Sequence, residues 1–376
     1  MDFQYNLPVN IIFGRGKASC VGEQVSLYGK KALIVTGTSS TKKSGLLDRT
    51  VDSLKAAGVE SVVFDKVRQN PLTTTAMEGA VLAKSEGCSV ILGLGGGSIM
   101  DCAKAVAFMS VNDGDINDYI YNRLTSDRAL PLVAVPTTCG TGSEGNGFAV
   151  LTNPENGDKK SLRCRAIIPK VSIVDSELMQ TMPKHILSSV GFDALCHSME
   201  AYVSKLSQPM TEYMALSAIK LIGENLADIY NGSDNPDSWD SVSWASTLGG
   251  MSIFVSGVAL PHGMEHPASG LKNIVHGRGL AALTPVIIDA SCESSKEKYE
   301  KISRLLGGTS AADCGDTVRK LLEKIGLSVG LGEQGITEGD IPWMTENCFK
   351  VSAASIANHP KAFDRKAIEE IYRKAL

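Results

Sequence analysis

Histidine and aspartate residues at helical spacings are the first feature of this sequence that could do chemistry. Asp193 precedes His197 by four residues, His262 precedes His266 by four, and His276 follows ten residues later. Residues four apart point the same way from a helix. One carboxylate and three imidazoles are ligands for a divalent transition metal and would leave a coordination position open for a substrate oxygen. Each group alone is more often a helix-surface pair or a polar loop, but together they predict a metal site.

A glycine-rich turn is the second feature. The run ILGLGGGSIMDCAK places Gly95, Gly96 and Gly97 between a predicted strand and a helix that we expect to begin at Ser98. Glycines allow a close backbone approach, and a helix N-terminus offers free N–H groups and partial positive charge, which together hold a pyrophosphate. Ser98 could cap the helix, and Asp101 occupies a capping-box position from which it would bond a backbone N–H. This turn follows no standard nucleotide motif, and alone it is as often a plain tight turn.

A second turn, PTTCGTGSE, follows the next predicted strand. Its hydroxyl groups, on Thr137, Thr138, Thr141 and Ser143, could bond ribose or phosphate oxygens. Alone it would more often be an ordinary loop. Two such turns at the carboxyl ends of two strands of one parallel sheet favour a nucleotide cleft.

The surrounding pattern indicates which elements position these residues. Strand-like runs alternate with helical patterns in the first half, which predicts right-handed βαβ units and a parallel sheet. The expected strands are 31–36, 61–65, 89–94 and 130–136, and the expected helices are 46–57, 74–86 and 98–109. Helical patterns dominate later, at 193–205, 210–226 and 361–376, with a turn-rich loop at 231–237.

We therefore predict two domains. Residues 1–180 would form an α/β dinucleotide-binding domain with a parallel sheet, and residues 181–376 an all-helical metal-binding, catalytic domain. The boundary is expected near residues 177–183. Their junction would hold the substrate, with a lining spread over loops such as 253–260 and 359–363.

Composition excludes several classes of protein. The 37 basic and 41 acidic residues give a net charge of −4, and no basic run of nucleic-acid type occurs. No apolar stretch reaches about 18 residues, so no membrane span is expected. The N-terminus lacks the features of a signal peptide, and the nine cysteines form no CxxC pair. We expect a cytoplasmic protein with free thiols and a small-molecule substrate.

The segments GGGSIMDCAK, PTTCGTGSE, GFDALCHSMEAY and PHG…H…VHG occur in the order and spacing of one known family. The chain resembles the iron-containing (group III) alcohol dehydrogenases over essentially its whole length. The resemblance implies that Asp193, His197, His262 and His276 hold the metal. It implies that His266 is not a ligand but lies beside the nicotinamide, in proton relay.

The resemblance also implies the cofactor site, the metal and the assembly. It places Gly95, Gly96, Gly97 and Ser98 on the pyrophosphate, Thr137, Thr138 and Thr141 along the cleft, and Val150 and Lys159 near the nicotinamide and ribose. Lys160 is an alternative to Lys159, because the two are adjacent. Fe(II) is the family's usual metal, although the same ligands would hold Zn(II). Relatives are often dimers, so at least a homodimer is expected.

One departure from the family bears on the choice of cofactor. Many NAD-preferring relatives carry an aspartate after the first strand of the βαβ region, where this chain has Gly37. A carboxylate about 4 Å from a 2′-phosphate would repel each unit of its charge by about 4 kcal/mol at an effective dielectric constant near 20. Without it, hydroxyl and ammonium donors can receive the phosphate, so we predict a preference for NADP(H). The expected donors are Thr38, Ser39, Ser40, Lys42 and Lys43.

Several alternatives stay open. Glycerol-type and phosphonoaldehyde-type dehydrogenases, dehydroquinate synthase-like enzymes and hydroxyacid–oxoacid transhydrogenases share the architecture, although the paired glycine turns argue against the synthase branch. A non-catalytic nucleotide- or metal-binding protein and a helical zinc hydrolase are rivals from other classes. The favoured function is hydride transfer between a nicotinamide cofactor and a small primary alcohol, diol or aldehyde.

Overall fold

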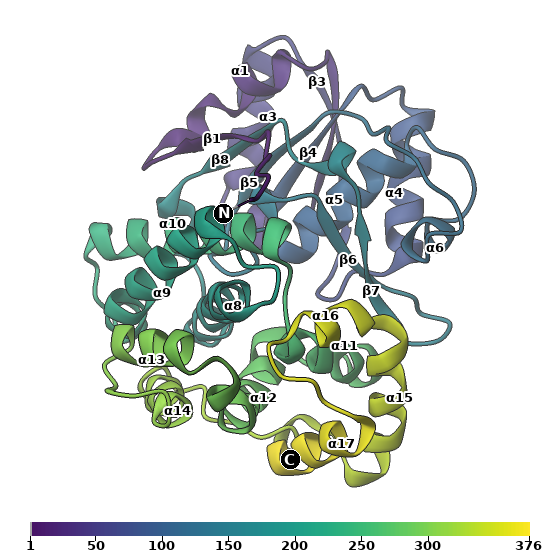
Figure 1. The fold of residues 1–376 in the computed structure, drawn as a ribbon. Coiled ribbons are helices and arrows are strands. Elements are labelled where there is room, and N and C mark those ends of the chain that lie inside the picture. Colours follow the sequence, from purple (N-terminus) through teal and green to yellow (C-terminus); the bar gives the residue numbers. More distant parts are fainter. Residues whose placement is uncertain (1) are drawn as a thin grey trace.

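A six-stranded parallel sheet forms the core of the N-terminal half in the computed structural model, which describes residues 2–376 (Figure 1). The strand order is β1-β8-β5-β4-β2-β3. The bounds are β1 (Asn10–Phe13), β2 (Lys31–Gly37), β3 (Glu60–Val67), β4 (Val90–Gly95), β5 (Leu132–Pro136) and β8 (Val171–Val174). All pairings between these strands are parallel, so their carboxyl ends lie at one edge of the sheet.

Helices cover both faces of this sheet, because successive side chains of its strands point to opposite sides. In β2, Ala32 and Ile34 pack with helices α1 (Val21–Ser26) and α3 (Leu46–Ala56). Leu33 and Val35 pack on the other face with α4 (Thr73–Ser85) and α5 (Gly97–Met109). Two short helices, α2 (Ser40–Lys43) and α6 (Ile116–Ile120), lie in the connections.

An antiparallel hairpin extends from the sheet toward the helical half. It consists of β6 (Phe148–Thr152) and β7 (Lys159–Arg163), with Val150 opposite Ser161. The sequence pattern did not predict this hairpin, or strands β1 and β8.

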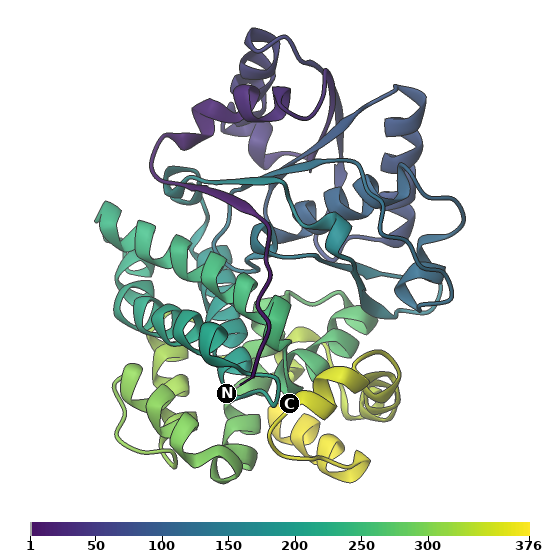
Figure 2. The ribbon, with the colours of Figure 1, turned by 45° about the horizontal axis from the view of Figure 1, so that its top comes forward.

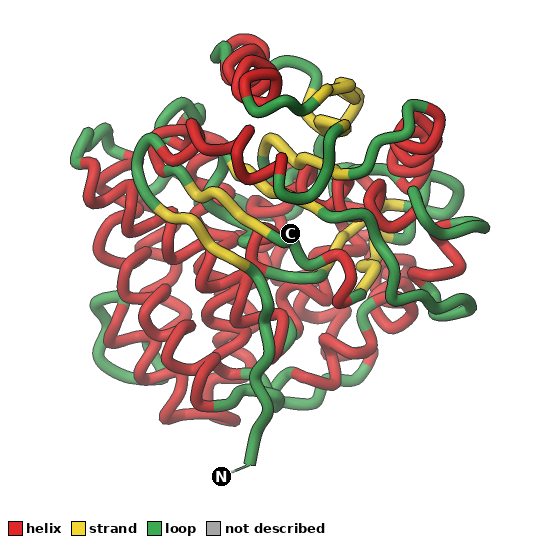
Figure 3. The backbone as a smooth tube through the Cα atoms, turned by 90° about the horizontal axis from the view of Figure 1, so that it is seen from above, coloured by secondary structure: helices red, strands yellow, loops and turns green. Residues whose placement is uncertain are grey.

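From Ser176 onward the chain is helical, and in Figures 1 and 2 this half occupies the lower part of the molecule. Figure 3 shows the segment before β1 leaving the sheet as a long loop. The long central helices pack around one apolar core, and the last helices form another. The bounds are α7 (Ser176–Met179), α8 (Lys184–Val203), α9 (Pro209–Tyr230), α10 (Pro236–Ser256), α11 (Leu260–Lys272), α12 (His276–Ser291), α13 (Lys296–Leu305), α14 (Cys314–Lys324), α15 (Ile341–Val351), α16 (Ala353–Asn358) and α17 (Arg365–Ala375).

The predicted fold class is confirmed: a parallel-sheet half is followed by a helical half. The α7–α8 connection spans the expected boundary, and the exact division into domains stays a prediction. Within residues 2–376, no single helix is long and apolar enough to span a membrane; α10 and α11 meet the length and composition test only as a pair bent by 102°. All nine cysteines are free.

Candidate metal centre and cofactor cleft

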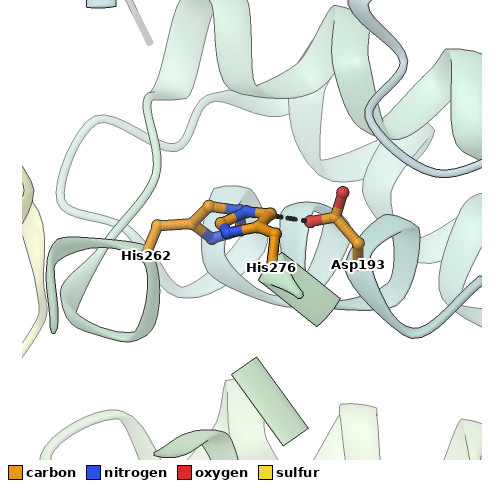
Figure 4. Close-up of side chains that lie close together, drawn as sticks. All are labelled: Asp193, His262 and His276. Atoms are coloured by element: carbon orange, nitrogen blue, oxygen red, sulfur yellow. Dashed lines mark ion pairs between the residues drawn. The ribbon is translucent and has the colours of Figure 1, made fainter. Parts of the chain in front are cut away.

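Three helices bring the predicted metal ligands together. Asp193 and His197 lie in the middle of α8, His262 lies in the first turn of α11, and His276 is the first residue of α12. The Asp193 Oδ1 atom is 3.3 Å from Nε2 of His262 and 3.6 Å from Nε2 of His197 and of His276. Figure 4 shows Asp193, His262 and His276 facing one another. Side chains from distant parts of the chain thus converge at one point.

A close contact between two helices makes this convergence possible. At Gly277, next to His276, an added Cβ would clash with the backbone of Ser189 on α8. Only glycine lets the start of α12 approach α8 this closely. The contact brings His276 to Asp193.

The donor atoms fit a divalent transition metal. Donors of Asp193, His262 and His276 lie within 4.8 Å of one another, and the ring of His197 stacks on that of His262 with centroids 4.4 Å apart. Ligands about 2.1 Å from a tetrahedral centre lie about 3.4 Å apart, close to the separations seen here. Asp193 Oδ1 and His262 Nε2 are buried and have no hydrogen-bond partner within residues 2–376. Buried polar atoms without partners are costly, and a shared cation would satisfy them.

Two buried glutamates orient the histidines. Glu200 Oε1 lies 2.6 Å from Nδ1 of His262, and its other oxygen accepts a 2.6 Å hydrogen bond from the backbone N–H of Ala259 at the start of α11. Glu265 Oε2 contacts Nδ1 of His276. A carboxylate on Nδ1 fixes the ring so that Nε2 faces the metal, and it makes the imidazole a stronger ligand.

The charges at this centre are strongly coupled. Burial alone would raise the pKa of Asp193, but the imidazoles of His197, His276 and His262 outweigh it and hold this pKa well below its ordinary value. Burial would lower the pKa of His262, but Glu200 and Asp193 raise it to about 10. The two carboxylates therefore require a positive charge between them. A bound divalent cation would supply that charge in place of a proton on His262.

His266 lies beside this centre. Its ring centroid is 6.2 Å from that of His262 and 5.8 Å from that of His276. Burial, followed by the positive charge of Lys159, holds the pKa of His266 well below its ordinary value, although Glu265 acts in the opposite direction. A neutral imidazole at this position can both accept and donate a proton.

A cavity, here called the inner cavity, adjoins the metal centre. It is bordered by the four proposed ligands and His266, by residues of the α5 start and of the hairpin, and by apolar side chains of α10 and its end. The lining residues are Asn70, Pro71, Gly97, Ser98, Asp101, Thr141, Ser143, Asn146, Phe148, Val150, Lys159, Ser161, Arg163, Asp193, His197, Ile253, Val258, His262, His266 and His276.

A longer cleft runs from the inner cavity along the carboxyl ends of the strands. Asn70, Gly97, Ser98, Thr141 and His276 border both, so the two are continuous. The cleft residues predicted from the sequence that border it are Gly37, Thr38, Ser39, Ser40, Gly96, Gly97, Ser98, Thr137, Thr138 and Thr141. An elongated ligand in this cleft would reach the metal centre with one end.

Glycines in the α5 turn make room at the junction of the cleft and the inner cavity. A Cβ on Gly97 would clash with the side chain of Thr141, and one on Gly96 would lie 3.0 Å from Thr138 Oγ1. Gly95 has a φ of +154° and borders neither the cleft nor the inner cavity. The close approach of backbone and ligand is therefore a property of Gly96 and Gly97, while Gly95 shapes the turn behind them.

The capping role expected for Asp101 and Ser98 is wrong. Helix α5 begins at Gly97, with Gly96 at its N-cap and no side-chain cap. Asp101 instead reaches out of its helix and accepts hydrogen bonds from Ser143 Oγ at 2.6 Å and the Val150 N–H at 2.9 Å. It thereby fixes the segment that follows β5 against α5. Tertiary partners thus replace the local cap.

Lys104 supports the same segment. Its buried ammonium donates to Ser143 Oγ, Asn146 Oδ1 and the Phe148 carbonyl at 2.7, 3.0 and 2.7 Å. Burial lowers the pKa of Lys104 to about 8, although Asp101 and Glu144 act in the opposite direction. The lysine was part of the quoted glycine motif, but its role depends on contacts that the sequence does not show.

The structure distinguishes the two adjacent lysines of β7. Lys159 borders the inner cavity, and its Nζ lies 3.0 Å from Asn70 Oδ1 and 3.6 Å from Glu265 Oε2. Lys160 lies on the other side of the strand and donates to the Val351 carbonyl at 3.0 Å. Lys159 is therefore the lysine that faces the predicted nicotinamide site.

Glu200 and Glu265 are two site residues that the sequence analysis did not predict. Their spacing in the sequence offered a signal. Glu200 lies seven residues after Asp193 and Glu265 lies three after His262, so both lie on the same helix faces as the proposed ligands.

Lys42, expected to contact the cofactor, instead forms an ion pair with Asp65. Arg68, not predicted, borders the cleft beside Gly37.

Comparisons with known proteins point to one family. The family described as iron-containing alcohol dehydrogenase matches residues 8–176, and the C-terminal model of the Fe-containing alcohol dehydrogenase family matches residues 188–376. A 1,3-propanediol dehydrogenase of Citrobacter freundii is 34% identical over 99% of this chain and 98% of its own. An NADPH-dependent butanol dehydrogenase of Clostridium saccharobutylicum is 30% identical over 98% and 97%. The crystal structure of an archaeal alcohol dehydrogenase from a Red Sea brine pool superimposes with a TM-score of 0.96 at 34% identity, covering 100% of this chain and 99% of that one.

Fold, site and relatives define a metal-dependent, nicotinamide-linked alcohol dehydrogenase that acts on small alcohols, diols or aldehydes by hydride transfer. The chain belongs to the iron-containing alcohol dehydrogenase family. This membership excludes the zinc hydrolase and the non-catalytic binding protein as alternatives.

Proposed function

We propose that this enzyme interconverts small primary alcohols and aldehydes with NADP(H), using a divalent metal held by Asp193, His197, His262 and His276. The observation that carries the proposal is the convergence of buried donor atoms on Asp193 Oδ1 beside a cleft that follows the strand ends. Fe(II) is the proposed metal, with Zn(II) as the alternative. Bound there, the metal supplies Lewis-acid stabilisation of negative charge on the substrate oxygen.

The protein's own backbone and side-chain groups would bind the cofactor. Gly96, Gly97 and Ser98 would receive the pyrophosphate at the start of α5. Thr137, Thr138 and Thr141 would bond the nucleotide along the cleft. Asp101 would act indirectly, because both its oxygens are engaged in holding Ser143 and Val150.

Lys159 and Val150 would position the nicotinamide and its ribose at the inner cavity. Lys159 is held by Asn70 and faces Glu265, so its ammonium has a defined place. His266 would carry the proton between the substrate oxygen and solvent, with ribose hydroxyls as intermediates. Its contact with the inner cavity supports this role.

The end of β2 supports a preference for NADP(H). Gly37 borders the cleft together with Thr38, Ser40 and Arg68, and no carboxylate borders that end of it. Arg68 makes no side-chain hydrogen bond or ion pair within residues 2–376, so its guanidinium can receive a 2′-phosphate. The ion pair of Lys42 with Asp65 leaves Arg68 as the stronger candidate.

The enzyme is also proposed to act as a cytoplasmic homodimer or higher homo-oligomer, with no nucleic-acid or membrane partner. The net charge of −4 and the absence of a basic run support the last point.

Metal removal and restoration test the proposed function. Protein reconstituted with Fe(II) should oxidise NADPH in the presence of butyraldehyde, lose this activity on chelation, and regain it with Fe(II) or Zn(II). Activity should be higher with NADPH than with NADH at equal concentration. Full activity in metal-free protein, or none in loaded protein with any short aldehyde, would contradict the proposal.

A further inference from the structure

A second cavity, here called the outer cavity, adjoins the inner one beyond His266. It lies between β7, the end of α6 and the α15–α16 segment, which Figure 1 shows beside the hairpin. Ser161, Arg163 and His266 border both cavities, so the outer one continues the inner one. Its lining residues are Ile120, Asn122, Lys160, Ser161, Arg163, His266, Lys350, Val351, Ser352, Ala353, Ala354 and Ser355.

The outer cavity carries positive charge that is only partly compensated. Lys160, Arg163 and Lys350 border it, and no aspartate or glutamate does. Lys350 is paired with Asp158 at 2.7 Å. Lys160 makes no ion pair within residues 2–376. It donates to the Val351 carbonyl and lies over the ring of Tyr121, 5.9 Å from the centroid, and burial lowers its pKa.

Arg163 is the least compensated cation. Its guanidinium lies over the ring of Phe148, 4.8 Å from the centroid, and makes no ion pair or side-chain hydrogen bond within residues 2–376. The side chain of Arg163 is exposed to solvent on one side. Protein still surrounds its guanidinium closely enough for desolvation to lower its pKa. A guanidinium stays charged under such conditions, and stacking on Phe148 leaves its N–H edge free to bind an anion.

A hydroxyl without a partner borders the same space. Ser352 is 4% exposed, and its Oγ has no hydrogen-bond partner within the described chain. Buried polar atoms in native proteins are nearly always satisfied. A rotation of this hydroxyl toward a bound anion would satisfy it.

We propose that the outer cavity binds an anionic group of the substrate, so that the preferred substrate is a short aldehyde or alcohol with a carboxylate, sulfonate or phosphonate at its far end. The proposal rests on the proposed function, because the reacting carbon must lie at the metal centre. Arg163, at the border of the two cavities, would make the main contact, with Lys160 adding charge.

The cleft proposed for the nucleotide does not reach the outer cavity. No residue of the cleft that follows the strand ends borders the outer cavity. The nucleotide and the anionic group would therefore approach the inner cavity from different sides, and the positive charge of the outer cavity is not needed for the pyrophosphate.

Matched substrates test the inference. Succinic semialdehyde, sulfoacetaldehyde and phosphonoacetaldehyde are compared with neutral butyraldehyde and propionaldehyde, using Fe(II)-loaded enzyme and NADPH. We expect at least one anionic aldehyde to show a kcat/KM about tenfold or more above both neutral ones. This advantage should shrink as salt is raised to about 0.15 M and beyond, because screening weakens the attraction.

Three variants test whether the charge of Arg163, and not a change in folding, sets the preference for an anionic substrate. The ratio of kcat/KM for the preferred anionic aldehyde to that for butyraldehyde should fall about tenfold in Arg163→Met and be partly restored in Arg163→Lys. Arg304→Met, the same change at an exposed residue of α13, should leave the ratio unchanged.

The possible outcomes are distinct. Reduction of neutral aldehydes with no preference for any anionic one overturns the inference and leaves the proposed function standing. An anionic preference that persists in Arg163→Met also overturns the inference. No reduction of any aldehyde overturns the proposed function itself.

Discussion

The candidate metal centre differs in composition from the part of the cleft that we propose for the pyrophosphate. That part, here called the phosphate end, is formed by Gly96, Gly97, Ser98 and the threonines that follow β5. The metal centre consists of one carboxylate and three imidazoles from three helices, and two buried glutamates orient two of the imidazoles, those of His262 and His276. The phosphate end consists of backbone, glycines and small hydroxyls at the strand ends. The comparison teaches that a metal cation needs strong donor atoms held in fixed positions inside the protein. A pyrophosphate needs mainly free N–H groups and enough space. Substitutions should therefore reduce activity strongly at the metal centre, and less strongly and by varying amounts at the phosphate end.

The largest expected effect is at a proposed ligand. His262→Ala should lose the metal and lower kcat by about a thousandfold or more, because several kcal/mol of charge stabilisation disappear. Metal analysis of purified protein, together with NADPH turnover, checks this prediction.

Two histidine variants serve as controls. His266→Ala should keep its metal while turnover slows, since we propose His266 as a proton carrier and not as a ligand. His185→Ala, on an exposed position of α8, should change neither quantity. A full complement of metal in His262→Ala would remove that residue from the ligand set.

The next effect is at the carboxylates behind the ligands. Glu200→Gln keeps the shape but weakens the charge on Nδ1 of His262, so metal affinity should fall about 10- to 100-fold. Titration with a metal-chelating competitor measures this directly. Glu224→Gln, an exposed glutamate of α9, is the matched control. Equal metal affinity in Glu200→Gln and the wild type would show that Glu200 acts only at the start of α11.

At the phosphate end, the addition of a single methyl group should weaken cofactor binding. The Cβ of Gly97→Ala would press against Thr141, so the dissociation constant for NADPH should rise about tenfold while the metal stays bound. Quenching of protein fluorescence on cofactor binding gives that constant. Gly339→Ala is the control, because its Cβ would meet only Thr337 Oγ1 at 3.7 Å. Loss of metal in Gly97→Ala would mean that the two regions are not independent.

The smallest effect is a change in cofactor choice. At Gly37 an added Cβ would meet only Ile99 and the Val67 carbonyl, both at 3.7 Å, so a side chain can begin at this position without a clash. Gly37→Asp should lower the NADPH-to-NADH ratio of kcat/KM by about tenfold, through repulsion of the 2′-phosphate. An unchanged ratio would refute the assignment of this position.

A contrast between local and tertiary features also explains which elements could be predicted from the sequence. Strand β2 and helix α5 were predicted to within about a residue, because their patterns are local. Strand β1 was missed, since its four residues at a sheet edge are exposed or half-buried and carry almost no pattern. Helix α10 is buried on many sides and shows no amphipathic period, so only the loop before it was predicted.

Site residues divide in the same way. The glycine turns and the histidine pairs have local spacings that chemistry can interpret. The actual partners of Asp101, and the roles of Glu200 and Arg68, depend on elements distant in sequence that meet only in the folded chain. Such roles follow from tertiary packing and not from spacing.

The central claim is that four side chains share one cation. An anomalous-scattering map from crystals of the Fe(II)-loaded enzyme, recorded at the iron edge, tests it directly. We predict one strong peak about 2.0–2.3 Å from a carboxylate oxygen of Asp193 and from Nε2 of His197, His262 and His276. A peak bound elsewhere, or one that does not contact Asp193, would contradict the account.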